Sequence, residues 1–415
     1  MKVLVIGGGA AGLMAAGSTA ENGCAVTLLE RNERTGMKVR ITGKGRCNVT
    51  NDCADLQELI AQIPGNGRFL YSAFSAFMPQ DTMRFFEQLG VPLKTERGRR
   101  VFPQSDSAQD IADALYRYAQ QNGVRFRRER VTELCVENGE VCGVRCESGA
   151  EYDTDRVIIA TGGCSYPRTG STGDGYSLAA AVGHTVIPPV PSLVPLVCHE
   201  GFCSDLMGLS LRNVTVRVLD TTKKDKVIFQ EFGEMLFTHF GVSGPLILSA
   251  SAHMRPMERN RYRIAIDLKP ALTAEQLDKR VQRDFAENIN RNFINALNGL
   301  LPKKLVPVIV RLSGVSASAK VNSITKEQRA VLVALLKNLT LTVRDFRPVD
   351  EAIVTAGGVK TAEVNPKTLE SKIVKGLYFA GEVLDVDAYT GGFNLQIAFS
   401  TGRLAGSVQK DNALS

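Results

Sequence analysis

The sequence predicts an α/β protein whose two ends build one parallel sheet, with an inserted region of strands and helices between them. Three observations predict this arrangement: a glycine-rich turn joins a strand pattern to a helix pattern at residues 2–22, four prolines interrupt residues 188–195, and a buried strand followed by glycine and an acid returns at residues 377–382. Strand, helix and strand in succession favour a parallel sheet. Prolines cannot donate to a sheet ladder, so we expect them to mark a crossing between domains.

The N-terminal elements follow from apolar runs and glycine punctuation. Residues 2–6 (KVLVI) are continuous and β-branched, as expected of a buried strand. Residues 10–22 predict a helix closed by Gly23, and residues 25–30 a second strand. These segments form a β-α-β unit.

A β-meander is expected before the next strand of the sheet. Asn138-Gly139 and Ser148-Gly149 supply its turns, because Asn and Gly tolerate positive φ. Residues 156–160 then return as a buried strand. The strands of the meander are Val131–Val136, Val141–Cys146 and Tyr152–Asp153.

The inserted region is predicted to be β-rich at first and helical later. Thr273 with Gln276, and Thr325 with Gln328, form capping boxes at two helix starts. The alternating strand residues are Leu209, Leu211, Val214, Val216, Val218, Tyr262, Ile264, Ile266 and Leu268. The apolar stripe expected of the first helix is Leu277, Val281, Phe285, Ile289, Phe293 and Leu297. Glycine-punctuated strands resume near Glu351 and end at residues 377–380, before a last helix at residues 397–405.

Composition excludes several classes of protein. No apolar run approaches the roughly 18 residues of a membrane span, and no signal peptide is expected, so the cytoplasm is the expected compartment. Nine scattered cysteines without a C-x-x-C pair argue against a disulfide framework and a zinc site. The four histidines lack metal-ligand spacing, so we expect no metal.

The glycine pattern Gly7-x-Gly9-x-x-Gly12 has the context that a dinucleotide site requires. A strand precedes it, a helix beginning at Ala10 and Ala11 follows it, and Glu30 closes the next strand. The glycines would allow a tight turn, approach of a pyrophosphate and close helix packing, and Glu30 would accept hydrogen bonds from a ribose.

A meander crossover favours FAD over NAD, and two further strand ends support that choice. Residues 160–163 (ATGG) end a strand in small residues, where backbone can approach a cofactor closely. The segment from Gly376 to Gly381-Glu382 ends another, and a helix N-terminus after Gly391 would offer amides to flavin oxygens or phosphate. The expected cofactor contacts at these ends are Ala160, Thr161, Gly162, Gly381, Glu382, Gly392, Phe393, Asn394, Leu395 and Gln396.

Four motifs resemble the BaiN/RdsA-like family of bacterial FAD-dependent oxidoreductases, over essentially the whole chain. They are Ile41-Thr-Gly-Lys-Gly-Arg-Cys-Asn-Val-Thr-Asn51, Gly162-Gly-Cys-Ser-Tyr-Pro-Arg-Thr-Gly-Ser-Thr-Gly-Asp-Gly175, Leu236-Phe-Thr-His-Phe-Gly-Val-Ser-Gly-Pro245 and Gly381-Glu-Val-Leu-Asp-Val-Asp387. The resemblance implies a split Rossmann-like FAD domain (residues 1–190 and 347–415), a β-barrel-like insertion (191–270 and about 339–346) and a small helical domain (271–338). It also implies reduction of carbon–carbon double bonds, in a uridine of 23S ribosomal RNA or in bile-acid-like steroids.

Candidate catalytic residues lie in three of these motifs. Arg46 and Cys47 follow the second strand, and Lys38 belongs to the same cationic stretch, which suits a pyrophosphate or a substrate phosphate. Cys47 is a candidate proton donor beside the flavin, although a lone cysteine also serves as a small packed hydrophobic residue. His239 and Tyr166 are the other candidates, each with a structural role as the alternative. Further cofactor contacts are expected at Arg31, Lys38, Arg46, Cys47 and Val131.

The expected reaction is hydride transfer from NADH or NADPH, through FAD, to an activated double bond. The inserted region is expected to cover the reactive edge of the flavin. The net charge of +7 permits ribosomal RNA as a partner. The basic stretches at Arg97–Arg100, Arg125–Arg130 and Lys303–Lys304 are interpreted first as solvated faces and second as a nucleic-acid surface. The rival functions are a small-molecule enone reductase and a non-catalytic flavin-binding sensor or partner. The sequence leaves the oligomeric state open.

Overall fold

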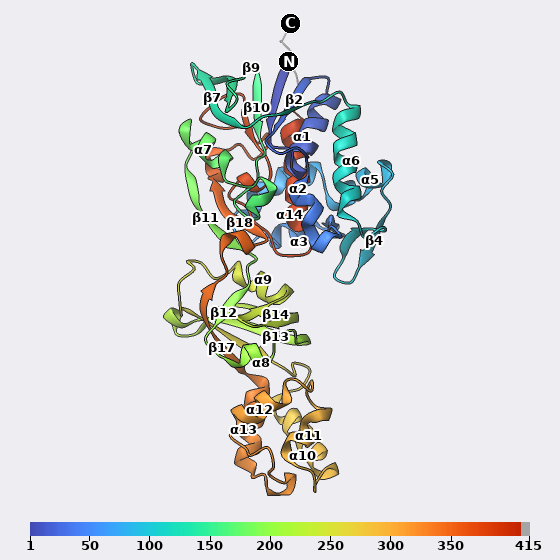
Figure 1. Cartoon of the computed structure of the whole chain (residues 1–415), viewed down its shortest axis with the longest axis vertical. Coiled ribbons are helices and arrows are strands. Elements are labelled where there is room, and N and C mark those ends of the chain that lie inside the picture. The colour runs from blue at the N-terminus through green and yellow to red at the C-terminus, as the bar shows by residue number, and fades with distance from the viewer. Residues whose placement is uncertain (408–415) are drawn as a thin grey trace. The chain divides into compact units, whose positions relative to one another are not determined.

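The computed structural model describes residues 1–407, which fall into two compact units (Figure 1). The terminal unit comprises Met1–Ser192 together with the chain from Val349 onward, and the inserted unit comprises Leu193–Pro348. The junctions predicted from the sequence lie within two residues of these boundaries. No helix within residues 1–407 combines the length and apolar character that a bilayer crossing requires.

The terminal unit contains a five-stranded parallel sheet in the order β19-β10-β1-β2-β6. Pairing of β19 with β10, and of β10 with β1, places a C-terminal strand in the sheet that the N-terminus begins. The predicted sharing of one sheet by the two chain ends is therefore confirmed. The strands are β1 (Lys2–Ile6), β2 (Ala25–Glu30), β6 (Arg125–Arg128), β10 (Arg156–Ile159) and β19 (Leu377–Phe379).

Alternate side chains of β1 enter the two cores that cover the sheet. Val3 and Val5 join one core, whereas Leu4 and Ile6 join the other. Burial of each such side chain stabilises the fold by about 1.5–3 kcal/mol, which explains why the strand is apolar at every position after Lys2. The first core includes helices α1 (Ala10–Glu21), α6 (Ala108–Gln121) and α14 (Phe393–Gly406), and the second includes the meander β7 (Val131–Glu137), β8 (Glu140–Cys146) and β9 (Glu151–Asp153).

Strand β6 was not predicted from its sequence, RFRR, which suggests a solvated basic face. It pairs with β2 at the edge of the parallel sheet. Arg125, Arg127 and Arg128 are exposed, while the ring of Phe126 lies 4.8 Å from that of Tyr116 on α6. Backbone pairing with β2 and burial of one side chain outweigh the low apolar content of this segment.

The proline-rich segment, expected to mark a crossing between domains, is itself a strand that ends at the boundary between the two units. Strand β11 (Val186–Ser192) pairs antiparallel with β18 (Val354–Val359) in a two-stranded sheet. The register shifts between Ile187 and Val190, so Pro188 and Pro189 occupy the irregularity. A ribbon of two strands leaves one side of each strand unpaired, where the missing proline N–H costs no ladder bond.

The inserted unit contains a closed six-stranded barrel in the order β12-β15-β14-β13-β16-β17. A register shift between Leu211 and Val214 of β13 lets both side chains be buried although they lie three positions apart. The predicted alternation therefore holds with one interruption. The barrel strands are β12 (Leu196–Cys198), β13 (Ser210–Asp220), β14 (Lys226–Thr238), β15 (Gly241–Ser243), β16 (Tyr262–Asp267) and β17 (Leu339–Phe346).

Helices between β16 and β17 pack on the barrel through one continuous apolar core. Both predicted capping boxes are present: the hydroxyls of Thr273 and Thr325 each accept a hydrogen bond from the backbone N–H three residues later. The predicted apolar stripe is wrong at Ile289, which is 52% exposed, because α10 ends at Glu287 and an asparagine-rich turn follows. The helices are α10 (Ala274–Glu287), α11 (Phe293–Ala296), α12 (Val306–Ser313) and α13 (Lys326–Lys337).

Candidate functional site

The carboxyl ends of four parallel strands bring the predicted cofactor segments to one edge of the sheet. Strands β1, β2, β10 and β19 run in the same direction, so the residues that follow each of them meet there. Those residues are the glycine turn after Ile6, Glu30, the ATGG segment after Ile159 and the Gly381-Glu382 pair after Phe379. Ligands in open α/β sheets bind at this edge.

The glycine turn after β1 has the close contacts that its sequence predicts. Gly7 adopts φ +101°, and a Cβ there would lie 2.6 Å from the carbonyl oxygen of Ala160. A Cβ on Gly12 would lie 1.8 Å from the Gly7 oxygen, whereas one on Gly9 would meet nothing within 4 Å. Gly7 and Gly12 thus pack the turn, and Gly9 leaves open space beside the N-terminus of α1. The first amides of a helix have no intrahelical partner, so this space suits a phosphate.

The carboxylate of Glu30 is fixed beside this turn. Its two oxygens accept hydrogen bonds from the backbone N–H groups of Gly8, at 2.7 Å, and Asn32, at 2.8 Å. A carboxylate has about four acceptor sites, so Glu30 retains capacity for a ribose hydroxyl. Arg31 instead points to Thr172 and Asp174, at 2.6 and 3.2 Å from its Nη1.

Lys38 and Glu382, predicted separately as cofactor contacts, form an ion pair with each other. Lys38 Nζ lies 2.7 Å from Glu382 Oε2 and 2.6 Å from the hydroxyl of Ser165, which is fully buried. Glu382 Oε1 accepts from the Thr355 N–H at 2.8 Å. The hydroxyl of Thr355 in turn accepts from the N–H groups of Cys164 and Ser165. One partly buried network therefore joins β18 to the ends of β10 and β19.

The ATGG segment leaves one polar atom without a protein partner. Thr161 Oγ1 is buried and has no hydrogen-bond partner among the described residues. Buried hydroxyls are normally satisfied. Together with the open space at Gly9, this hydroxyl fits a site built to receive an additional polar group, as FAD would supply. Val131 and Ala160, also predicted as contacts, are both buried.

The N-terminus of α14 is brought close to a short strand by Gly392. This residue adopts φ +100°, and a Cβ there would lie 2.3 Å from the carbonyl carbon of Thr50. The first-turn amides, which include those of Phe393 and Leu395, have no intrahelical partners. The Asn394 side chain instead bonds the backbone of Ala388, at 2.8 Å. We therefore expect backbone amides, rather than the Asn394 side chain, to face the cofactor.

Gln396 is a buried anchor for three segments. Its Oε1 accepts hydrogen bonds from Thr50 at 2.6 Å and Thr82 at 2.9 Å, and its Nε2 donates to the Phe77 oxygen at 3.0 Å. The side chain is fully engaged by protein atoms. Because its side chain is occupied, only the backbone of Gln396 remains a predicted contact of the cofactor.

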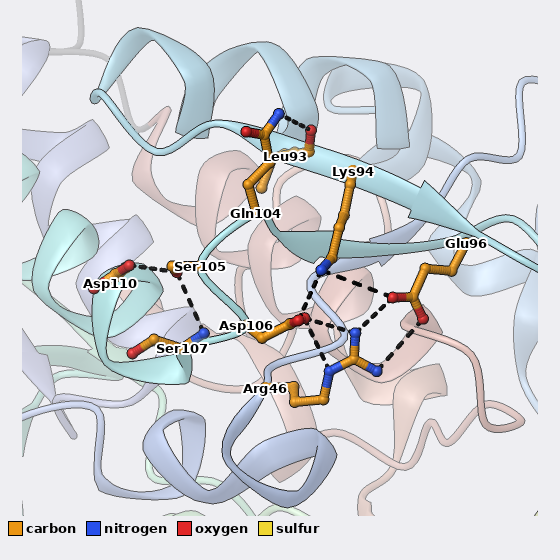
Figure 2. A network of polar contacts seen from close by, with 9 residues as sticks. All are labelled: Arg46, Leu93, Lys94, Glu96, Gln104, Ser105, Asp106, Ser107 and Asp110. Atoms are coloured by element: carbon orange, nitrogen blue, oxygen red, sulfur yellow. Dashed lines mark hydrogen bonds and ion pairs between the residues drawn. The ribbon is translucent and has the colours of Figure 1, made fainter.

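Arg46 is directed toward a three-stranded sheet of β3 (Thr50–Asn51), β4 (Leu93–Glu96) and β5 (Arg100–Pro103). Figure 2 shows its guanidinium between two carboxylates, with Nη2 2.5 Å from Glu96 Oε1 and 2.6 Å from Asp106 Oδ1. Lys94 approaches Asp106 from the other side, at 2.8 Å. The Arg46 guanidinium also lies 4.3 Å from the centre of the Phe102 ring. Arg46 thus holds its loop against the β4–β5 hairpin.

Cys47 is fully buried in the core beneath that loop. It adopts φ +59°, a conformation uncommon outside glycine. Burial raises the pKa of its thiol to about 12, so the thiol keeps its proton at neutral pH. The structure places Cys47 as a packed, protonated residue. Its catalytic role stays a prediction.

Tyr166 and His239 belong to different units. Tyr166 follows the ATGG segment with φ +52°, and burial raises the pKa of its phenol. His239 lies exposed in the turn between β14 and β15 of the barrel, with its ring edge-on to Phe240. Left-handed conformations of bulky residues cluster at functional sites, which favours Tyr166 as a candidate. Both roles stay predictions.

Sequence reasoning missed two anchors of this edge. Thr355, in a Thr-Ala-Gly-Gly segment, holds the chain after β10, and Asp174 receives both Arg31 and Arg130. Asp174 lies inside the glycine-rich segment 170–175, a signal that could have drawn attention to it. Neither pairing is visible in sequence spacing, because the partners are more than 40 residues apart.

Comparisons with known proteins identify the family of this chain. A family model described as the HI0933-like protein Rossmann domain matches residues 1–408. A 3-dehydro-bile acid delta(4,6)-reductase from Clostridium scindens is 33% identical over 409 residues, 98% of both chains. Ribosomal RNA dihydrouridine synthases are similarly related: 31% identical for Escherichia coli (96% of this chain and 95% of that one) and 32% for Haemophilus influenzae (96% of both).

A solved structure supports the fold alone. The 3-ketosteroid delta1-dehydrogenase from Sterolibacterium denitrificans covers 98% of both chains with a TM-score of 0.50, at 13% identity. The family match and the relatives both span the full length of the chain. Together with the arrangement of the strand ends, they establish the class of protein. The chain belongs to the HI0933-like family, which its BaiN/RdsA-like motifs indicate, and is an FAD-dependent oxidoreductase.

Proposed function

We propose that this enzyme uses NADH or NADPH to reduce the activated ring double bond of a uridine in 23S ribosomal RNA, giving dihydrouridine. Two of the full-length relatives are named ribosomal RNA dihydrouridine synthases. The observation that carries the choice is the net charge of +7. RNA presents a phosphate at every nucleotide, and phosphate contacts dominate nucleic-acid affinity. A steroid offers no comparable reason for an excess of cations.

The sequence contains a single Gly-x-Gly-x-x-Gly pattern, at Gly7–Gly12. The sequence therefore gives no second motif of this kind to indicate a separate domain for the nicotinamide reductant. We infer that NAD(P)H and the acceptor visit the same open side of the cofactor in turn. Alternating visits predict ping-pong kinetics.

Different residues would bind the cofactor, position the strand ends and deliver the proton. When bound, FAD supplies hydride transfer. The amides at the start of α1 and α14 would hold its phosphates and an anionic flavin oxygen, and Glu30 its ribose. Lys38 and Glu382 would keep the strand ends in register around it. Tyr166 and His239 are the candidates to deliver a proton to the substrate carbon, ahead of the buried Cys47.

The test is direct conversion of RNA. Enzyme, NAD(P)H and a 23S rRNA transcript should yield an RNA fragment heavier by two hydrogens, located by mass analysis, while a strain lacking the gene should lose that dihydrouridine. Absence of product from RNA, together with an intact dihydrouridine in the deletion strain, would reject this function.

A steroid enone is the second candidate, favoured by the Clostridium scindens relative that matches 98% of the chain. Its conjugated carbonyl suits the same hydride chemistry. NAD(P)H consumption with a 3-oxo steroid diene, but not with RNA, would replace the uridine assignment. The two acceptors should be compared at equal enzyme and flavin content.

A further inference from the structure

The net positive charge of this protein comes entirely from the inserted unit. Residues 193–348 contain 23 Lys and Arg against 14 Asp and Glu, a net charge of +9, while the terminal unit contains 27 against 29, a net charge of −2. Within the inserted unit, residues 271–338 alone hold 11 cations and 5 carboxylates. This segment, which contains helices α10–α13 and the loops between them, is therefore the more basic part of the inserted unit.

Many of these cations have no acidic partner. Six exposed side chains in residues 271–338 lie more than 4.0 Å from every carboxylate of the described chain: Lys279, Arg291, Lys303, Lys304, Lys320 and Lys326. Lys304 and Lys320 donate only to backbone oxygens, of Met207 and Asn290. By contrast, several exposed arginines of the terminal unit are paired, such as Arg99 with Glu58 and Arg128 with Glu33. The basic stretches named from the sequence thus differ in how many of their cations have an acidic partner.

The helices do not need these cations in order to fold. Leu277, Val281 and Phe285 form the buried face of α10, and threonine hydroxyls already cap α10 and α13. Lys303 and Lys304 lie just before Leu305, the N-cap residue of α12. A helix N-terminus carries positive partial charge, so these two lysines do not stabilise the helix.

We propose that residues 271–338, which comprise helices α10–α13 and the loops that connect them, form the docking surface for the RNA substrate. This inference rests on the function proposed above and adds to it the part of the molecule that recognises the partner. Each lysine or arginine neutralises a backbone phosphate and releases a counterion, which gives affinity without reading the base sequence. The helical segment would bind the backbone, while the strand ends of the terminal unit would act on the base.

The test compares two fourfold variants of the full-length holoenzyme. One carries Lys279→Gln, Lys303→Gln, Lys320→Gln and Lys326→Gln. The matched control carries Arg68→Gln, Arg117→Gln, Lys367→Gln and Lys372→Gln, four exposed cations of the terminal unit. Fluorescence anisotropy with a labelled 23S rRNA fragment measures affinity from about 0.05 to 0.2 M salt.

We expect the helical variant to bind at least about 10-fold more weakly, with the slope of log K against log salt reduced by roughly 3, and the control to stay within about threefold of wild type. Lys→Arg at the same four helical positions should retain binding, and unchanged flavin absorbance and thermal midpoint should show intact folding. Equal weakening of both Gln variants, or of neither, would overturn the inference. Equal affinity for duplex DNA of the same length would overturn the assignment to RNA.

Dihydrouridine formation separates this inference from the proposed function. If the wild-type enzyme binds the fragment through the helices but forms no dihydrouridine, the docking surface stands and the reaction is wrong. If the helical variant binds and converts RNA as well as wild type does, the reaction stands and the docking surface is wrong.

Discussion

The two units of this protein use charged side chains in opposite ways. At the strand ends of the terminal unit, cations and carboxylates neutralise each other, as in Lys38 with Glu382 and Arg46 between Glu96 and Asp106. In the helices of the inserted unit, cations outnumber carboxylates and many are exposed without an acidic partner. A cofactor site requires fixed geometry, which closed networks provide, whereas a polyanion surface requires charge left available to a partner.

The largest expected effect separates the two roles of the glycine turn. Gly12→Ala should prevent folding of the terminal unit, because its Cβ would lie 1.8 Å from the Gly7 oxygen. Gly9→Val should fold but lose FAD, because no protein atom lies within 4 Å of its Cβ and the side chain would fill the approach of the pyrophosphate. Flavin absorbance per protein and circular dichroism would measure both. A Gly9→Val enzyme that retains FAD would contradict the phosphate site.

The next effect concerns the ion pair that joins the strand ends. Lys38→Met should lower the free energy of unfolding by about 1–3 kcal/mol, because Glu382 would be left partly buried and unpaired. Lys38→Met with Glu382→Gln should recover part of that loss, since no charge would remain. Urea unfolding of the holoprotein measures both. Equal stability of the single variant and wild type would show that the pair is solvated.

Cys47 predicts a pH effect on stability. The pKa of the Cys47 thiol in the folded protein, about 12, exceeds the usual value of a thiol. The contribution of this thiol to the free energy of unfolding is therefore fully present below about pH 8.5 and is lost as pH rises toward 12. Cys47→Ala should therefore weaken the decline of stability at alkaline pH, measured by urea unfolding at pH 7 and pH 10. We also expect Cys47→Ala to keep its FAD and to turn over within about threefold of wild type. A fall of about 10²-fold with FAD bound would make Cys47 the proton donor.

The last comparison distinguishes positioning from catalysis at Arg46. Arg46→Gln and Glu96→Gln should both lower turnover by roughly tenfold or less, because each loosens the same loop. Steady-state kcat and KM for both variants, at equal FAD content, provide the measurement. A much larger loss confined to Arg46→Gln would place its guanidinium against the cofactor or the substrate.

The sequence by itself determined the elements whose cause is local. The glycine turn, the strand of residues 2–6, the meander turns and the two capping boxes are dictated by φ preferences, apolar runs and side chains three residues apart. The sharing of one sheet by both chain ends was also predictable, since each cofactor segment is a strand that ends in small residues. The family motifs identified the cofactor for the same reason.

The tertiary structure alone decided which distant residues meet. It made a strand of the arginine-rich segment 125–128, paired Lys38 with Glu382 across 344 positions, and turned Arg46 toward Glu96. These outcomes depend on long-range pairing and burial, which composition and spacing do not encode. The charged residues at this site could be predicted from the sequence, but the partner of each charge could be identified only from the fold.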